Sequence, residues 1–431
     1  MAGVDPLSQI HDTRDNVAMI TSFRGFVLVC LVAGVSGILL TRDLCSQTTP
    51  SVPRVFLVDG KRLQEIRQHL AGPQRDKNAA AAVDKIEADA RKALKQGTFS
   101  VTSKSVTPPS GDKHDYMSQA PYFWPDPTKK DGLPYIRKDG ERNPEINKIT
   151  DHKTLDDMVG AVETLSLAYY FRGDEAYAVK AVVLLRAWFI DPATRMNPNM
   201  EYAQYVPGVN TGRGIGLLET RGLTRAVDAI GLLDASKALT PADKKGLTDW
   251  FTKFVAWMQE SKNGKEESAS QNNHGTYYDV QLTSFALFVG QNNLARSVVE
   301  TAKTKRIARQ IEPDGSQPLE LARTKGWSYS VMNLEGLVTL AELADHAGID
   351  LWNYETKDGR GIRKAFDFLY PFAEGEKWKY QQIGDWPSDI LFPVMRRASA
   401  KYADSKFRSM MAKVPAASAA DKENLLYSEK N

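Results

Sequence analysis

The 431-residue sequence has little of several features that would place it in a familiar class. Its only two cysteines, Cys30 and Cys45, are too few for a disulfide framework or a cysteine-ligated zinc site. The 56 Lys and Arg residues nearly balance the 53 Asp and Glu residues, and a net charge of +3 gives no sign of the basic face of a nucleic-acid-binding protein. We therefore expect no nucleic-acid partner.

Long apolar runs are also scarce. The run from Gly25 to Leu40 is shorter than the ~20 residues that span a bilayer as a helix. Arg24 precedes it and no clear small-x-small cleavage site follows, so it is typical of either a secretory signal peptide or an uncleaved signal anchor, with a buried N-terminal helix as the alternative. We expect residues 1–45 to be an export signal or anchor. A secreted or extracytoplasmic protein follows, with membrane contact only if the segment stays uncleaved.

Strand patterns are few, and apolar residues at helical spacing dominate after a Ser-, Thr- and Pro-containing linker at residues 46–60. Residues 61–431 are predicted to form one all-α domain. No repeat of fixed length marks a solenoid, so an α/α toroid of antiparallel helical hairpins is favoured. Helices are expected at residues 61–70, 78–96, 155–171, 174–189, 214–232, 241–259, 277–287, 293–308, 327–347, 361–371 and 386–402.

Two stretches interrupt this helical pattern. Residues 110–145 are rich in aromatic residues and proline, which favours a lid or cleft wall over disorder, with a structural wrap as the alternative. Residues 191–216 combine amides, arginines and tyrosines, which suits a sugar-binding surface, although a well hydrogen-bonded loop would look the same. The candidate substrate-binding residues in the two stretches are Tyr122, Trp124, Tyr202, Gln204, Asn210 and Arg213.

Two polar clusters could carry chemistry. An amide beside an imidazole at the start of a helix, Asn273-His274, can hold a carboxylate and move a proton, whereas a structural cap would explain only part of the cluster. Arg323 and Tyr329 are six residues apart and would not share a face of one helix, but a turn near Gly326 could bring them together. Trp327 lies between them as a further candidate for substrate binding.

Several motifs resemble those of the alginate lyase family, in particular the branch that includes glucuronan lyases. The similarity runs from about Tyr116 to Tyr402. It rests on A-P-Y-F-W-P-D-P at 120–127, D-G-L-P-Y-I-R at 131–137, D-P-A-T-R-M-N-P-N at 191–199, Y-A-Q at 202–204, G-R-G-I-G at 212–216 and Q-N-N-H-G at 271–275.

The resemblance implies an incomplete α/α toroid that cleaves a uronic-acid polymer by β-elimination, with residues 61–431 as the lyase domain. Asn273 and His274 match the family's Asn-His pair, Arg323 its arginine and Tyr329 its catalytic tyrosine, although G-W-S-Y departs from the His-containing segment of better-known alginate lyases. Asn273 and Arg323 would neutralise the substrate carboxylate, and a tyrosinate favoured by a nearby cation would take the C5 proton. The scheme requires no metal or cofactor, and an acidic polysaccharide is the expected partner.

Two other functions remain open at this point. A glycoside hydrolase on a similar helical fold would need two carboxylates across the scissile bond, and Asp126, Glu201, Glu320 and Asp385 are candidates. A non-catalytic protein that binds acidic polysaccharides is the other alternative. A lyase differs from both because it releases products with an unsaturated, ultraviolet-absorbing end.

Overall fold

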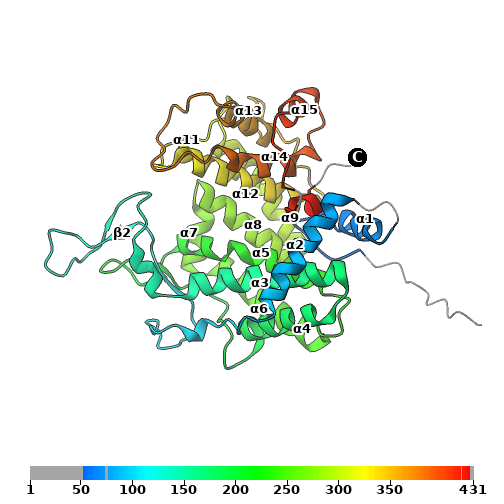
Figure 1. Cartoon of the computed structure of the whole chain (residues 1–431). Helices are drawn as coiled ribbons and strands as arrows, with labels where there is room; N and C mark the ends of the chain where they lie inside the picture. Colours follow the sequence, from blue (N-terminus) through cyan, green and yellow to red (C-terminus); the bar gives the residue numbers. More distant parts are fainter. Residues whose placement is uncertain (1–51, 73–75, 419, 428–431) are drawn as a thin grey trace, which may run out of the picture. The chain divides into compact units, whose positions relative to one another are not determined.

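The computed structural model describes residues 52–72, 76–418 and 420–427, and helices dominate them as predicted (Figure 1). The longer helices are α1 (Gly60–Ala71), α2 (Lys77–Ala93), α3 (Asp151–Arg172), α4 (Glu175–Leu185), α5 (Leu223–Leu232), α6 (Pro241–Glu260), α7 (Lys262–Ala269), α8 (Asn273–Phe288), α9 (Asn292–Ala302), α12 (Gly326–His346), α13 (Ile362–Ala373) and α14 (Leu391–Ser399). Shorter helices are α10 (Ala308–Gln310), α11 (Pro318–Leu321), α15 (Ser405–Met411) and α16 (Glu423–Leu426).

Helices that follow one another in sequence pack together as hairpins. After α3, Gly173 adopts the left-handed conformation with φ 74°, and the Asp174 side chain accepts a hydrogen bond from the backbone of Ala176 to cap α4. α4 packs on α3 and α9 on α8, while α3 contacts α5, α5 contacts α8, and α8 contacts α12. Paired helices in this succession are what an α/α toroid requires.

Local backbone geometry divides some of the predicted helices. Residues 186–190 and 303–307 are π-helical, and residues 214–222 form a 3-10 helix ahead of α5. Helix α7 was not predicted, because its sequence is polar and contains Gly264. That glycine is needed for packing: a Cβ there would lie 1.9 Å from the carbonyl oxygen of Met258.

Short strands join the two irregular stretches to each other. β1 (Met117–Gln119) pairs in parallel with β4 (Tyr202–Tyr205), and β2 (Phe123–Trp124) pairs with β3 (Ile136–Arg137) in an antiparallel hairpin. The segment around β2, cyan in Figure 1, projects from the helices. Gly216 permits a close approach to β4, since a Cβ there would lie 2.5 Å from the Cβ of Ala203. The two irregular stretches, residues 110–145 and 191–216, therefore form one loop unit.

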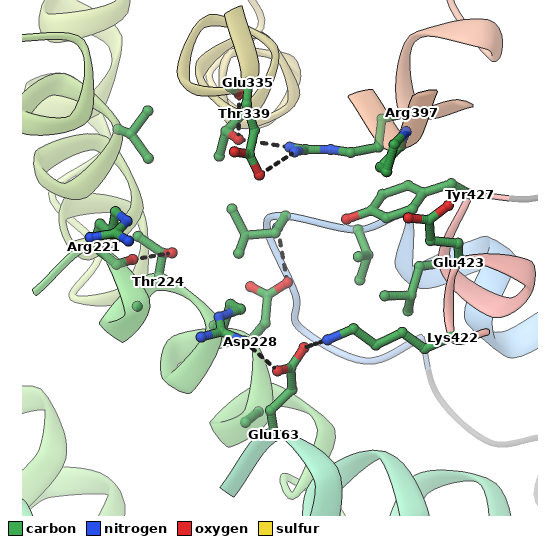
Figure 2. Close-up of a pocket in the computed structure, with 18 of the residues that line it drawn as sticks. Glu163, Arg221, Thr224, Asp228, Glu335, Thr339, Arg397, Lys422, Glu423 and Tyr427 are labelled. Atoms are coloured by element: carbon green, nitrogen blue, oxygen red, sulfur yellow. Dashed lines mark hydrogen bonds and ion pairs between the residues drawn. The ribbon is translucent and has the colours of Figure 1, made fainter. Parts of the chain in front are cut away.

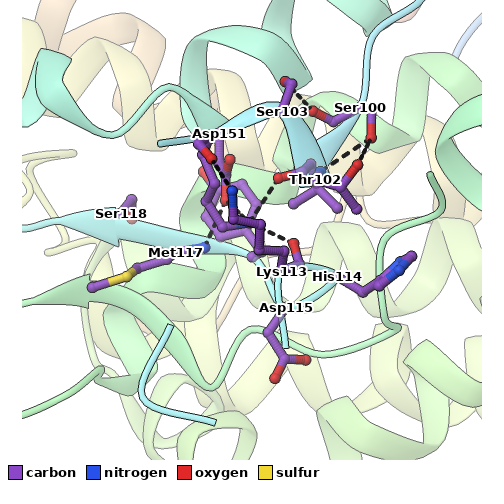
Figure 3. Close-up of polar contacts among 12 residues, drawn as sticks. Ser100, Thr102, Ser103, Lys113, His114, Asp115, Met117, Ser118 and Asp151 are labelled. Carbon is purple, nitrogen blue, oxygen red and sulfur yellow. Dashed lines mark hydrogen bonds and ion pairs between the residues drawn. The ribbon is translucent and has the colours of Figure 1, made fainter. Parts of the chain in front are cut away.

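A buried ion pair fixes the base of this unit to α3 (Figure 3). Nζ of Lys104 lies 2.9 Å from Oδ2 of Asp151, and both side chains are almost completely buried. Lys104 also donates to the carbonyls of Val101 and Lys113, and Asp151 accepts the backbone N–H of Met117 in β1. Burial raises the pKa of Asp151 to about 6, against the opposing effect of Lys104, and burial lowers the pKa of Lys104.

A cavity of about 450 Å³ lies between α3, α5, α8, α12 and α14, and both ends of the described chain help to line it (Figure 2). The segment before α1 contributes Leu57, and both carboxylate oxygens of Asp228 accept backbone N–H groups from Phe56 and Leu57. Burial raises the pKa of Asp228 to about 7. Val55 and Phe56 also belong to the apolar core, so the segment before α1 packs on the helices.

The apolar stretch from Gly25 to Leu40 and the rest of the predicted export segment, residues 1–45, lie outside the described residues. Within residues 52–72, 76–418 and 420–427, no helix has the length and apolar character needed to cross a membrane.

Candidate active site

The Asn273-His274 pair begins α8. The side chain of Asn272 caps the helix by accepting the backbone N–H of His274 at 3.3 Å. Asn273 is fully buried, and its backbone N–H and Nδ2 donate to the two carboxylate oxygens of Glu320 at 2.6 and 2.8 Å. Burial raises the pKa of Glu320, although both bonds from Asn273 oppose this effect. The amide oxygen of Asn273 is buried and has no hydrogen-bond partner among the described residues.

His274 is held from the neighbouring helix. Its Nδ1 lies 2.8 Å from Oε1 of Glu267 on α7, and the Glu267 side chain is fully buried, whereas 15% of the His274 side chain is exposed. The charges of Arg323 and His274 both act to lower the pKa of Glu320 on α11. Glu320 therefore links the start of α8 to the segment that carries Arg323.

Arg323 and Tyr329 meet across the start of α12, at the predicted turn near Gly326. Nη2 of Arg323 lies 2.8 Å from the Tyr329 hydroxyl, and the guanidinium sits 3.8 Å from the centre of the tyrosine ring. The loop unit reaches the same place: the hydroxyl of Tyr122 lies 2.9 Å from that of Tyr329. Asp139, which follows β3, accepts hydrogen bonds from Nε and Nη2 of Arg323 at 3.1 and 2.8 Å.

Burial, hydrogen bonds and charge act in opposite directions on the pKa values of this cluster. Burial and the Tyr122 hydrogen bond raise the pKa of Tyr329 well above its ordinary value, and the charge of Arg323 only partly offsets them. Burial and Tyr122 thus favour the neutral phenol of Tyr329, whereas Arg323 favours the tyrosinate. Burial alone would raise the pKa of Asp139, but Arg323 and Thr324 outweigh it and hold that pKa well below its usual range.

Arg213 is a second arginine, after Arg323, that contacts the loop unit. It donates to the backbone and side-chain oxygens of Gln204 at 3.1 and 2.9 Å, and its guanidinium lies 4.9 Å from the centre of the Phe123 ring. Burial lowers the pKa of Arg213 to about 10, with Arg137 adding to the effect. Gln204 has φ 48°, a strained conformation for a residue with a side chain and one that is concentrated at functional sites.

The alginate lyase family model matches residues 100–378. The chain belongs to the alginate lyase family.

Solved structures give the same result. An alginate lyase from Bacteroides ovatus is 43% identical, covers 88% of this chain and 100% of its own, and superposes with a TM-score of 0.84. Alginate lyase A1-III from Sphingomonas species A1 is 18% identical, covers 87% of this chain and 95% of its own, and has a TM-score of 0.56. An A1-III variant complexed with a tetrasaccharide, also 18% identical, covers 89% and 98% with a TM-score of 0.57. A search of curated protein sequences found no match.

Family membership makes the chain a polysaccharide lyase and confirms the predicted incomplete α/α toroid. Of the four carboxylates considered for a hydrolase, three are hydrogen-bonded to neighbouring residues and one is exposed. Glu201 binds Trp257 and Asn263, Asp126 binds Thr128 in its own loop, Glu320 binds Asn273, and Asp385 is exposed.

In this alginate lyase family member, the remaining predicted residues have different surroundings. Tyr202 is half-buried on β4. The indole N–H of Trp124 donates to the carbonyl of Glu141, and the ammonium group of Lys138 lies over the Trp124 ring. The Asn210 side chain closes a turn by accepting the backbone N–H of Val206 at 3.0 Å.

Trp327 lies in a cluster of tryptophan rings. Its ring is fully buried against Trp378 and Trp386, and its indole N–H donates to the carbonyl of Pro387. This packing anchors the start of α12, and a contact of Trp327 with substrate stays a prediction.

The structure thus brings Tyr122, Arg323 and Tyr329 into direct contact, and Gln204 into contact with Arg213. Sequence reasoning missed three carboxylates: Glu267 and Asp139 entirely, and Glu320 in its contact with Asn273. Glu267 precedes its histidine by seven residues on a different helix, and Asp139 lies 184 residues from Arg323, so no local pattern connects them. Within the described ranges, no group of three or more His, Cys, Asp or Glu side chains is placed to hold a metal ion.

Proposed function

We propose that this chain cleaves a uronic-acid polymer, either an alginate rich in mannuronate or a glucuronan, by β-elimination that leaves an unsaturated uronate end. The observation that carries this proposal is the contact of 2.8 Å between Nη2 of Arg323 and the Tyr329 hydroxyl, on a helix start that Glu320 and its neighbours link to Asn273-His274. A phenol, a guanidinium, an amide and an imidazole are the groups that this elimination needs.

The first requirement of the reaction is to neutralise the substrate carboxylate. The C5 proton of a uronate is hard to remove because the adjacent carboxylate already carries negative charge. Nδ2 of Asn273 uses one of its two hydrogens on Glu320, which leaves the other for a substrate oxygen. We assign Asn273 and Arg323 to the carboxylate, with His274 as a further donor or as the base.

The second requirement is to move a proton from C5 and to protonate the glycosidic oxygen as it leaves C4. As a phenol, Tyr329 is ready to donate to the leaving oxygen. To act as the base, it must first lose its proton, and Arg323 is the group that stabilises the resulting phenolate. Tyr329 is therefore the assigned acid for every uronate polymer.

Stereochemistry decides which residue is the base. In β-mannuronate and β-glucuronate, the C5 proton and the C4 oxygen lie on the same side of the ring, so one tyrosine could perform both steps. In guluronate they lie on opposite sides, and His274 would take the proton while Tyr329 protonates the leaving oxygen.

Arg213, Gln204, Tyr122, Trp124 and Tyr202 are proposed to hold the neighbouring sugars. The tetrasaccharide complex of alginate lyase A1-III supports an oligosaccharide ligand for this fold. We also propose that residues 1–45 export the protein, which would place it where such polymers occur.

A substrate panel tests the proposal. The purified chain is incubated with polymannuronate, polyguluronate, glucuronan and a neutral glucan, and the near-ultraviolet absorbance of unsaturated ends is followed together with the number of reducing ends. We expect absorbance to rise with at least one uronate polymer and not with the neutral glucan.

Each other outcome supports a different function. New reducing ends without absorbance would mean hydrolysis, and binding of a uronate polymer without any product would mean a non-catalytic binding protein. His274→Asn, tested on every polymer that is cleaved, separates the two assignments of the base: a rate lost only on polyguluronate supports Tyr329 as the base for the other two.

A further inference from the structure

Two aromatic side chains on the segment that follows α13 are exposed to solvent. Tyr380 is 40% exposed and Trp386 is 39% exposed. In the part of the chain that the structure describes, the other exposed large apolar side chains are valine, leucine and isoleucine. Aromatic rings usually bury most of their area, because that burial contributes much of the stability of a fold. Exposed rings gathered on one segment therefore indicate a binding surface.

The two rings belong to one packed cluster. The ring of Trp378 contacts both, with its centre 5.0 Å from that of Tyr380 and 5.6 Å from that of Trp386. Trp386 also packs at 4.8 Å against the fully buried ring of Trp327. Because their neighbours hold both rings in place, a ligand that stacks on them would cost the protein little side-chain entropy.

The aromatic segment, residues 377–386, is attached to the start of α12. The backbone N–H of Ile383 donates to the carbonyl of Thr324 at 2.8 Å, and Nε2 of Gln382 donates to the hydroxyl of Ser328 at 3.2 Å. Thr324 and Ser328 are the sequence neighbours of the arginine and the tyrosine of the proposed site. The aromatic segment is therefore continuous with the place where that arginine and tyrosine meet.

The charges of the aromatic segment nearly cancel. It carries two lysines, Lys377 and Lys379, and one aspartate, Asp385, and all three are exposed. This balance attracts a polyanion only weakly, and exposed charges are screened over about 10 Å at 0.1 M salt. The ring faces of Tyr380 and Trp386 are thus the feature that a ligand would recognise.

We propose that Tyr380 and Trp386 form a sugar-binding platform for uronate units of the polymer next to those held at Arg323 and Tyr329. This inference rests on the proposed function and extends the binding surface beyond the region that the family model matches, which ends at residue 378. An aromatic face stacks on the C–H face of a pyranose ring, and the polar end of a tyrosine or tryptophan bonds its hydroxyls.

A platform of this kind selects among uronate polymers by shape. In β-glucuronate and β-mannuronate chains the glycosidic bonds leave the ring equatorially, so each unit presents a flat C–H face for stacking. In polyguluronate these bonds leave the ring axially and crowd its faces. Stacking at Tyr380 and Trp386 should therefore favour glucuronan and polymannuronate over polyguluronate.

Leucine substitutions test the platform because they keep apolar packing and remove the flat face. In Tyr380→Leu and Trp386→Leu, we expect KM for polymannuronate or glucuronan to rise about 3–10-fold, the usual size of one aromatic contact, with kcat within about two-fold. Tyr380→Phe keeps the ring and should keep KM near the parent value. Val183→Ala, at a valine of α4 that is 37% exposed, is the matched control and should change neither constant.

A length series of uronate oligosaccharides tests whether the rings act at a distance from the bond that is cleaved. In the parent, KM should fall as the oligomer becomes long enough to reach the rings. In the double variant Tyr380→Leu with Trp386→Leu, this gain should be smaller, whereas the shortest cleaved oligomer should have the kcat/KM of the parent. The difference should persist at high salt, because stacking is not screened.

Binding can also be measured without turnover. Polymannuronate and glucuronan oligosaccharides are titrated calorimetrically into Tyr329→Phe and into the same protein with either leucine substitution, and Kd should rise by the factor seen in KM. Thermal unfolding identifies a variant that fails to fold. Trp386 packs on the buried Trp327, so Tyr380→Leu provides the decisive measurement if Trp386→Leu unfolds.

The possible outcomes separate the platform from the proposed function. If the parent cleaves a uronate polymer and the folded leucine variants keep its KM, Kd and length dependence, the platform is wrong and the lyase function stands. A parent dimer that becomes monomeric in these variants, with KM unchanged, would assign the rings to an interface between copies of this chain and would also overturn the platform. A parent that cleaves none of the polymers would overturn the proposed function itself.

Discussion

At the scale of single residues, the guanidinium of Arg323 already contacts Tyr329 and Asp139 in the absence of substrate. One face of its guanidinium lies on the Tyr329 ring, Nη2 contacts the Tyr329 hydroxyl, and Nε and Nη2 bind Asp139. The net pKa of Tyr329 nevertheless stays raised, because burial and Tyr122 outweigh this one cation. The pKa of Tyr329 therefore depends on its burial and on Tyr122 as well as on the nearby arginine.

Removing the Tyr329 hydroxyl should separate chemistry from binding. We expect Tyr329→Phe to lower kcat by about 1,000-fold or more with KM within a few-fold of the parent, since proton transfer by one positioned group contributes typically 10²–10⁴-fold. Steady-state kinetics on the best polymer measures this. Tyr354→Phe, whose ring lies beside Lys303, is the control and should leave kcat intact; an active Tyr329→Phe would exclude the hydroxyl from the reaction.

At the scale of elements, the loop unit is attached to the helices by buried polar contacts more than by regular sheet. β1 pairs with β4 over only a few residues, and the Lys104–Asp151 pair joins the segment before β1 to the first residue of α3. A buried pair of this kind contributes little net stability, but loss of one partner leaves an uncompensated charge. Its role is to fix one position for the loop unit that carries Tyr122 and Asp139.

Breaking this pair should destabilise the protein more than removing it. We expect Lys104→Met alone to cost about 3–5 kcal/mol of unfolding free energy, and the double variant Lys104→Met with Asp151→Leu to recover much of that loss. Denaturant unfolding of the parent and both variants measures the difference. If the double variant were as unstable as the single one, packing rather than unpaired charge would be the cause.

At the scale of the whole described chain, its two ends line the same cavity. Leu57 and Val58 precede α1, and Glu423 and Tyr427 lie in or after α16. All four line the cavity, as do Asp228 and Arg397 (Figure 2). Leu425 is fully buried in the apolar core, and Glu423 forms an ion pair with Arg396. None of the predicted site residues lines this cavity, so we expect changes in it to leave catalysis intact.

Removing the C-terminal segment tests that separation. A chain that ends at Ser418 loses the burial of Leu425, worth about 1.5–3 kcal/mol, and should unfold a few degrees lower. Its kcat at a temperature well below unfolding should match the parent, because the first turns of α8 and α12 are unchanged. A large loss of kcat without a change in melting temperature would instead connect this cavity to the active site.

The amount that the sequence predicts differs between these scales. Helices with apolar residues at regular spacing and clear caps, such as α3 and α4, were placed within a few residues. Asn273, His274, Arg323 and Tyr329 were identified as chemically suited residues, but their partners were not. Glu267 and Asp139 depend on contacts between separate elements, and the burial of Trp327 depends on Trp378 and Trp386, which only the folded chain brings together.

Asp139 has a consequence for the kind of ligand that this site can favour. It is itself a carboxylate bound to Arg323, so any uronate that approaches the guanidinium competes with a rival tethered to the same molecule at high effective concentration. A free uronate monomer has only one carboxylate with which to compete. If a polymer binds at Arg213 and the neighbouring aromatic side chains, as proposed, its next carboxylate is held near Arg323 and competes with Asp139 on equal terms. Avidity along the polymer would then favour long substrates over short ones.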